Sequence, residues 1–152
     1  MEEIRIRIAE EKDARAMIEF NQAMAFETEG RKLDPDKISG GVRAVFDGSE
    51  RAFYVVAETS ESEIIGGLMV TKEWSDWRNG WFWWIQSVYI LPEGRGKKIY
   101  SRMYDFVKER AKAMGGVCGF RLYVEKDNSH AQKVYESLGM IETDYLMYEE
   151  EV

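Results

Sequence analysis

Hydrophobic positions recur with two periods along the chain, and together they predict strands alternating with helices. Isoleucines alternate with arginines over residues 4–8, the pattern of a half-buried strand. Further strands are expected over residues 52–59, 64–72, 81–90, 120–125 and 143–149. Helical spacing of apolar residues predicts helices over residues 14–30, 35–46, 99–114 and 131–138. This order predicts an α/β fold with a central sheet of mixed strand direction.

Local signals set the expected ends of these elements. Asp13 can cap the first helix, which is expected to fray over residues 26–30. Asp34 followed by Pro35 is a strong start for the second helix, because proline suits the first helical position. Gly66 and Gly67 interrupt a strand and indicate a bulge or a close backbone approach. Residues 73–80 are expected to form a loop leading into the central strand.

The stretch from Trp81 to Met114 predicts a strand, a glycine-containing turn and a helix. Unpartnered amides and the helix dipole make such a helix start favourable for phosphate, and glycine lets phosphate approach the backbone. Arg95, Lys97 and Lys98 add positive charge to the same turn. The alternative is a solvated basic turn that precedes an ordinary helix.

Composition narrows the classes of protein. A chain of 152 residues is expected to form one domain over residues 1–152. The net charge of −7 disfavours a general nucleic-acid binder and suits a cationic substrate. Cys118 is the single cysteine and His130 the single histidine, so neither an internal disulfide nor a metal site is expected. No export signal or membrane span is recognised, so we expect a cytoplasmic protein that does not bind membranes.

The motif over residues 88–96, Val-Tyr-Ile-Leu-Pro-Glu-Gly-Arg-Gly, resembles the signature of the GNAT-type N-acetyltransferases. The resemblance implies the GNAT fold, with a mixed, mostly antiparallel sheet flanked by helices, and acetyl-CoA as co-substrate. In the family, turn amides hold the pyrophosphate of acetyl-CoA. Lys98 and Tyr100 stand where the family has Gly and Gly or Ala, which puts the tightness and pose of the cofactor in question.

The resemblance also implies which residues contact the cofactor. The turn and helix start would bind pyrophosphate through Arg95, Gly96, Lys97, Lys98, Ile99, Tyr100 and Ser101. The strand end Val88-Tyr89-Ile90 would pair with the amides of pantetheine, as an added strand does. Two neighbouring strands are expected to splay apart here, and the N–H of Val88 would polarise the thioester carbonyl.

Residues 128–140 match the family's second motif, N-x-x-A-x-x-x-Y-x-x-x-G-[FM]. By this resemblance, Tyr135 is the candidate general acid that protonates CoA as it leaves, since the phenol pKa of about 10 lies not far above that of a thiol. The alternative is that Tyr135 is simply packed in the apolar stripe of its helix. Asn128 would bond to pantetheine or cap the helix.

The acceptor side is less defined by the sequence. Some family members carry a glutamate base near the position of Gln86, which cannot accept a proton. Glu27 is therefore the candidate base, acting directly or through water; Glu29 fits a solvated helix end better. The Trp-rich segment around Trp84 would belong to the core, the acceptor site or a dimer interface. Glu27, Trp84 and Gln86 are the predicted substrate-binding residues.

The sequence thus predicts an acetyl-CoA-dependent N-acetyltransferase acting on a primary amine of a small molecule or peptide by direct attack. The alternative is a CoA-binding sensor or assembly module of the same fold that transfers no acetyl group. A homodimer is left open.

Overall fold

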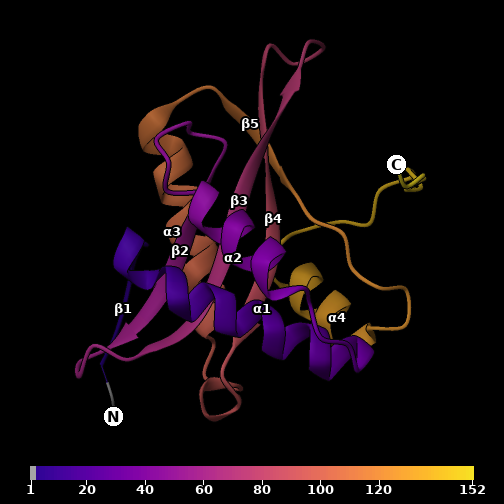
Figure 1. Cartoon of the computed structure of the whole chain (residues 1–152). Coiled ribbons are helices and arrows are strands. Elements are labelled where there is room, and N and C mark those ends of the chain that lie inside the picture. The colour runs from indigo at the N-terminus through magenta and orange to yellow at the C-terminus, as the bar shows by residue number, and fades with distance from the viewer. Residues whose placement is uncertain (1–2) are drawn as a thin grey trace. The chain divides into compact units, whose positions relative to one another are not determined.

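The computed structural model describes residues 3–152 (Figure 1). The chain separates into two compact units, Met1–Leu122 and Tyr123–Val152, and each is described by itself. The expectation of one domain over the whole chain stays a prediction.

The first unit is built on a sheet whose strands lie in the order β1-β2-β3-β4-β5. The strands are β1 (Ile4–Ile8), β2 (Ala52–Thr59), β3 (Ile64–Ser75), β4 (Gly80–Ile90) and β5 (Val117–Arg121). The first four pair antiparallel with their neighbours, and β5 pairs parallel to β4. The predicted α/β fold with a mixed, mostly antiparallel sheet is confirmed.

Helices cover both faces of this sheet. In the first unit they are α1 (Ala14–Glu29), α2 (Pro35–Ala44) and α3 (Ile99–Met114), with short 3-10 turns at Glu11–Asp13 and Pro92–Gly94. Met17 and Phe20 of α1 and Val42 of α2 share a buried cluster with Tyr54 and Tyr89 of the sheet. In Figure 1, α1 and α2 lie in front of the strands and α3 lies behind them.

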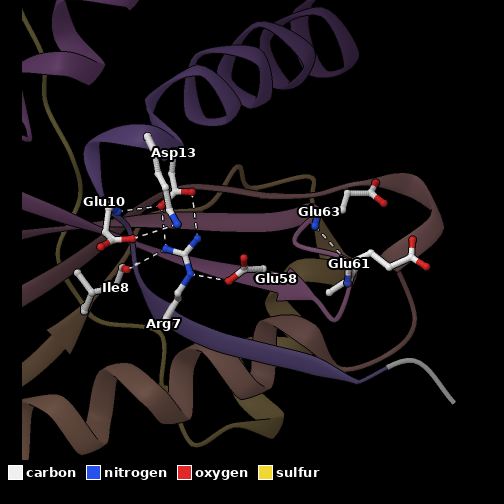
Figure 2. Close-up of polar contacts among 9 residues, drawn as sticks. Arg7, Ile8, Glu10, Asp13, Glu58, Glu61 and Glu63 are labelled. Atoms are coloured by element: carbon white, nitrogen blue, oxygen red, sulfur yellow. Dashed lines mark hydrogen bonds and ion pairs between the residues drawn. The ribbon is translucent and has the colours of Figure 1, made fainter.

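The starts of the helices show which capping predictions hold. Asp34 caps α2, since its Oδ1 accepts hydrogen bonds from the amides of Asp36 and Lys37 at 2.9 and 3.2 Å. Asp13 does not cap α1 with its side chain. Figure 2 shows the reason: the buried carboxylate of Asp13 accepts from the guanidinium of Arg7 at 2.8 and 3.0 Å and from the amide of Glu10.

Arg7 is the centre of this ion-pair cluster, because its Nε also donates to Glu58 at 2.6 Å. Burial is the largest single influence on Asp13 and raises its pKa, but the hydrogen bonds from Arg7 and from the amide of Glu10, with the attraction of Arg7 and Lys12, together outweigh burial, so the pKa lies below its usual value. The hydrogen bond to Asp13, against the cost of burial, raises the pKa of Arg7. The cluster therefore joins β1, the first helical turn and β2 through charged groups.

Gly66 and Gly67 of β3 serve both purposes that the sequence suggested. Their strand shifts register against β4 between Gly67 and Met69. A Cβ on Gly66 would lie 2.8 Å from the side chain of Ile90, and one on Gly67 would lie 3.0 Å from Met17. The glycines thus accompany a bulge and also let α1 and the end of β4 pack closely on β3.

The sheet differs from the prediction at three places. The predicted loop 73–80 is shorter, because β3 runs to Ser75 and β4 starts at Gly80. The strand predicted over 120–125 lies instead at Val117–Arg121, because its pairing starts beside Trp81, whose amide bonds to the carbonyl of Gly116 at 2.8 Å. The predicted strand over 143–149 is wrong: the structure forms none there, since a strand needs a hydrogen-bonded neighbour and those residues have no ladder partner in it.

The second unit contains helix α4 (Ser129–Ser137). Asn128 caps it, because its Oδ1 accepts from the amide of Ala131 at 3.1 Å. Gly139 follows with a left-handed φ of 98°, as the glycine at a helix end often does. Over residues 3–152, no helix has the length and apolar character needed to cross a bilayer.

Candidate active site

A bulge in β4 lies next to the predicted cofactor-binding strand end. Tyr89 pairs with Gly67 and Gln86 pairs with Met69, so two residues of β4, Ser87 and Val88, face a single residue of β3. Ser87 has a left-handed φ of 52°, which a non-glycine residue rarely adopts. The bulge turns the backbone at Val88 out of the regular ladder, at the position where the sequence predicts an N–H that polarises the thioester.

The edge of β4 beside this bulge is open toward β5. The ladder between the two strands ends where Trp84 lies opposite Arg121, whereas β4 continues to Ile90. Past Trp84, that edge of β4 has no β5 residue opposite it. The end of the ladder leaves a stretch of β4 backbone without β5 partners, to which an extended ligand could add, and the expected separation of two strands stays a prediction.

The turn after β4 folds tightly before α3 begins. The amides of Gly94 and Arg95 bond to the carbonyls of Leu91 and Pro92 at 2.8 and 3.2 Å. Gly96 has a φ of 78° with open space where a Cβ would stand. Lys98 has a φ of 60°, so a lysine holds a left-handed conformation that suits the family's glycine.

The start of α3 fits a bound phosphate group. Lys98 occupies the N-cap position, no side chain caps the helix there, and the first turn carries no acidic residue. In contrast, Asp34 caps α2 and Asp36 lies in its first turn. The first amides of α3 have no carbonyl one turn back within the helix, so an anion can accept from them. Residues 96–98 are exposed, so their backbone groups and the side chains of Lys97 and Lys98 are accessible to a ligand at the start of α3.

Glu27 joins α1 to the end of β4 and to the turn. Its Oε2 accepts a short hydrogen bond from the phenol of Tyr89, and its Oε1 accepts from Nη2 of Arg95 at 2.9 Å. Arg95 also donates through Nε to the carbonyl of Ile90 at 3.0 Å, and its Cζ lies 5.4 Å from the ring centroid of Tyr89. The structure therefore brings together four residues that the sequence assigned to cofactor or substrate.

These contacts shift the titration of both acidic groups. The hydrogen bond from Tyr89, followed by the one from Arg95, lowers the pKa of Glu27. Burial, together with the hydrogen bond to Glu27, raises the pKa of Tyr89. Glu27 is therefore held as a carboxylate whose two oxygens already accept hydrogen bonds.

Trp84 and Gln86 lie on the same face of β4 as Tyr89 and are tied to β3. Nε2 of Gln86 donates to Oγ1 of Thr71 at 2.8 Å, and Nε1 of Trp84 donates to Oε1 of Glu73 at 3.1 Å. Gln86 thus serves as a donor at the position where some family members carry a base. The hydrogen bond between Trp84 and Glu73 was not predicted, because the sequence analysis ended this strand at residue 72.

Arg121 is a second residue that sequence reasoning missed. It donates to Oε1 of Glu73 at 2.8 Å, and its guanidinium carbon lies 3.6 Å from the ring centroid of Phe82. Phe82 and Trp83 are both buried although they face opposite ways, so β4 is covered on both faces here. Arg78 and Arg121 lie over the ring of Phe82 on the second face, and which role the Trp-rich segment has stays a prediction. The exposed members of the Trp-rich segment are Trp74, Trp77 and Trp81.

Tyr135 and Asn128 lie in the second unit. Tyr135 is half-buried on α4, and burial raises the pKa of its phenol above the usual value of 10.0. A phenol with a raised pKa keeps its proton at neutral pH, as a general acid must. Asn128 caps α4, which is one of the two roles expected for it. Among residues 3–152, no three histidine, cysteine or acidic side chains group in a way that could hold a metal ion.

Comparisons with known proteins agree with this geometry. A sequence profile described as the acetyltransferase (GNAT) family matches residues 14–140. A search of curated proteins finds no match. The crystal structure of a possible acetyltransferase from Clostridium difficile 630 is 43% identical, with 98% of this chain and 97% of that chain covered and a TM-score of 0.89.

More distant structures share the fold. The crystal structure of a predicted acetyltransferase with acetyl-CoA from Clostridium acetobutylicum is 19% identical with a TM-score of 0.79, covering 97% of this chain and 96% of that chain. Glucosamine-6-phosphate N-acetyltransferase from Arabidopsis thaliana is 22% identical with a TM-score of 0.74, covering 97% and 98%. With its profile match, its 43% identical relative and its sheet, the chain belongs to the GNAT family of acetyltransferases.

Proposed function

We propose that this protein is an acetyl-CoA-dependent N-acetyltransferase that moves an acetyl group to a primary amine of a small molecule or peptide. The observation that carries the proposal is the joined arrangement of the bulge at Val88, the open edge of β4 and the uncapped start of α3. A strand edge can pair with pantetheine, and a helix start can bind pyrophosphate. The acetyl-CoA in the Clostridium acetobutylicum relative supports the same co-substrate.

Each group has a proposed task in the transfer. When bound, acetyl-CoA supplies the acetyl thioester, and the amine nitrogen forms a bond to the acetyl carbon as the carbon–sulfur bond breaks. The amide of Val88 would stabilise the negative charge that develops on the acetyl oxygen. Tyr135 would donate its proton to the departing sulfur, the cationic nitrogen of the tetrahedral intermediate would lose a proton to solvent, and solvent would return a proton to Tyr135, so that the products are the neutral amide and CoA.

The base that takes the amine's proton is the least defined part. The role of Glu27 as this base stays a prediction, and its contacts count against it, because both oxygens accept hydrogen bonds and its pKa is lowered. We therefore favour a water chain that carries the proton from an amine partly neutral at the working pH. Trp84 and Gln86 would line the acceptor side of β4, where indole can contact a cation.

Two measurements test the proposal. Calorimetry with acetyl-CoA should show binding, and a thiol-release assay over a panel of diamines, amino acids, aminoglycosides and peptides should show CoA released with at least one amine. Mass spectrometry of that amine should show one added acetyl group on nitrogen. The absence of acetyl-CoA binding would refute the proposal.

The second candidate is a CoA-binding sensor that transfers no acetyl group. It is favoured by the hydrogen-bonded state of Glu27 and by glutamine at position 86, which together leave no evident base at the strand end. Binding of acetyl-CoA without CoA release on any amine of the panel would support the sensor over the enzyme.

A further inference from the structure

The side chain of Arg95 is directed back to the strand it follows. Its contacts are the carbonyl of Ile90, the face of the Tyr89 ring and the carboxylate of Glu27. Its guanidinium is thus committed to the end of β4, and the adjoining turn presents its backbone and its two lysines outward. Ile90 and Tyr89 belong to the strand just before the turn, whereas Glu27 lies 68 residues away on α1 and therefore ties the turn to a different element.

We propose that Glu27 is a positioning residue that holds the phosphate-binding turn in its binding conformation through Arg95 and Tyr89. The inference rests on the proposed function, since it assigns a role in binding CoA. We call the set Glu27, Tyr89 and Arg95 the clasp.

The position of Glu27 makes the clasp rigid. It lies on the last turn of α1, which ends at Gly30 in a left-handed conformation, and α1 is anchored by buried residues such as Met17 and Phe20. Tyr89 is buried and its ring packs on Phe20 at a centroid distance of 5.3 Å. The partner groups of Arg95 are therefore held by the core, and the arginine transmits that order to the exposed turn.

Order in the free protein favours binding. A turn that is already in its binding conformation loses less conformational freedom when a ligand binds, so its affinity is higher. Without the charge of Glu27, Arg95 keeps its contacts with the carbonyl of Ile90 and the ring of Tyr89 but loses its ion pair. The turn is then less ordered in the protein before CoA binds. The loss should therefore appear in the affinity for CoA and in KM for acetyl-CoA, with kcat little changed.

A general base would behave differently. If Glu27 accepted the amine's proton, removing its carboxylate would lower kcat and remove a limb of the pH profile, while the affinity for CoA would stay the same. The two roles are separated by the parameter that changes, and the comparison does not depend on which amine is used.

The experiment uses Glu27→Gln, which keeps the size and an oxygen that can accept from Tyr89. The matched control is Glu19→Gln on the same helix, whose exposed carboxylate pairs with Arg15 at 3.2 Å. Calorimetry with CoA should give a dissociation constant about fivefold higher for Glu27→Gln, the size expected for a partly exposed ion pair, and no change for the control. Urea unfolding of each variant confirms that it is folded.

A double-mutant cycle with Arg95→Gln tests the connection. The double variant should bind CoA about as weakly as either single variant, because the two residues act through each other. Additive losses, or an unchanged dissociation constant for Glu27→Gln, would overturn the clasp while leaving the proposed function intact. A lowered kcat with unchanged CoA affinity would also overturn it, in favour of a base. A wild-type protein that binds no CoA would overturn the proposed function itself, and the clasp with it.

Discussion

Replacing Lys98 by glycine should stabilise this protein, although glycine at most positions destabilises. Lys98 has a φ of 60° and a ψ of 27°, and its side chain is exposed and makes no cap to α3. A non-glycine residue in the left-handed region costs roughly 1–2 kcal/mol. Glycine removes that cost, but its greater freedom in the unfolded chain takes back about 0.5–1 kcal/mol. The net gain in the free energy of unfolding is about 0.5–1 kcal/mol.

The neighbouring Lys97 supplies the control. It belongs to the same turn and is exposed, but it has no left-handed φ. Lys97→Gly should therefore show only the cost of glycine's freedom and lower the free energy of unfolding by about 0.5–1 kcal/mol. Both variants lose one positive charge, so their difference, about 1–2 kcal/mol, isolates the backbone conformation.

Equilibrium unfolding in urea, followed by the fluorescence of the five tryptophans, measures both variants. Thermal unfolding should agree, with the midpoint of Lys98→Gly raised by about 2 °C for a protein of this length. If the two variants were destabilised equally, the reasoning would be wrong, because the backbone at Lys98 would then carry no strain that glycine relieves.

The remaining predictions concern the ion-pair cluster, the sheet and the proposed acid. Asp13→Asn should lower the free energy of unfolding by about 2 kcal/mol at pH 7, because Arg7 loses one of its two carboxylates in a buried setting. Since the folded-state pKa of Asp13 is lowered, this difference from wild type should shrink as the pH falls below the usual value of 3.8, measured by urea unfolding at each pH. Gly119→Ala should cost about 1–3 kcal/mol, because its Cβ would lie 2.7 Å from the ring of Phe82; a small thermal shift would contradict this. Tyr135→Phe should lower turnover while acetyl-CoA still binds in calorimetry, and unchanged turnover across the pH range would remove Tyr135 from the mechanism.

The capping predictions for Asp34 and Asp13 had different outcomes: Asp34 caps its helix, and the side chain of Asp13 does not. Asp34 caps α2 through amides two and three residues away, so the whole interaction lies within one stretch of sequence. Asp13 has the same local signal, but Arg7 of β1 and the amide of Glu10 take its carboxylate instead. Both partners lie within six residues of Asp13, and the charge-assisted bond from Arg7 is stronger than a bond to an amide of the helix, so the local signal was outweighed by a competing near neighbour.

Much of the candidate site was also readable from the chain. The turn and the start of α3 lie where the motif predicts, because a glycine turn and an amphipathic helix are encoded by neighbouring residues. The partners of Glu27 were not readable, since Tyr89 and Arg95 lie 62 and 68 residues away from it. The ion pair of Glu73 and Arg121 was missed for the same reason, because these residues are 48 positions apart and meet only across β4, which lies between their strands.

The sequence by itself determined the helices, most strands and the family motifs of this protein, because period, caps and glycines act over a few residues. Tertiary structure alone decided which strands pair, where β5 begins and which carboxylates meet which cations. It also decided that residues 143–149 form no strand, despite their strand-like composition. The physical reason is that ladders and ion pairs depend on a partner's position in space, which local pattern does not specify.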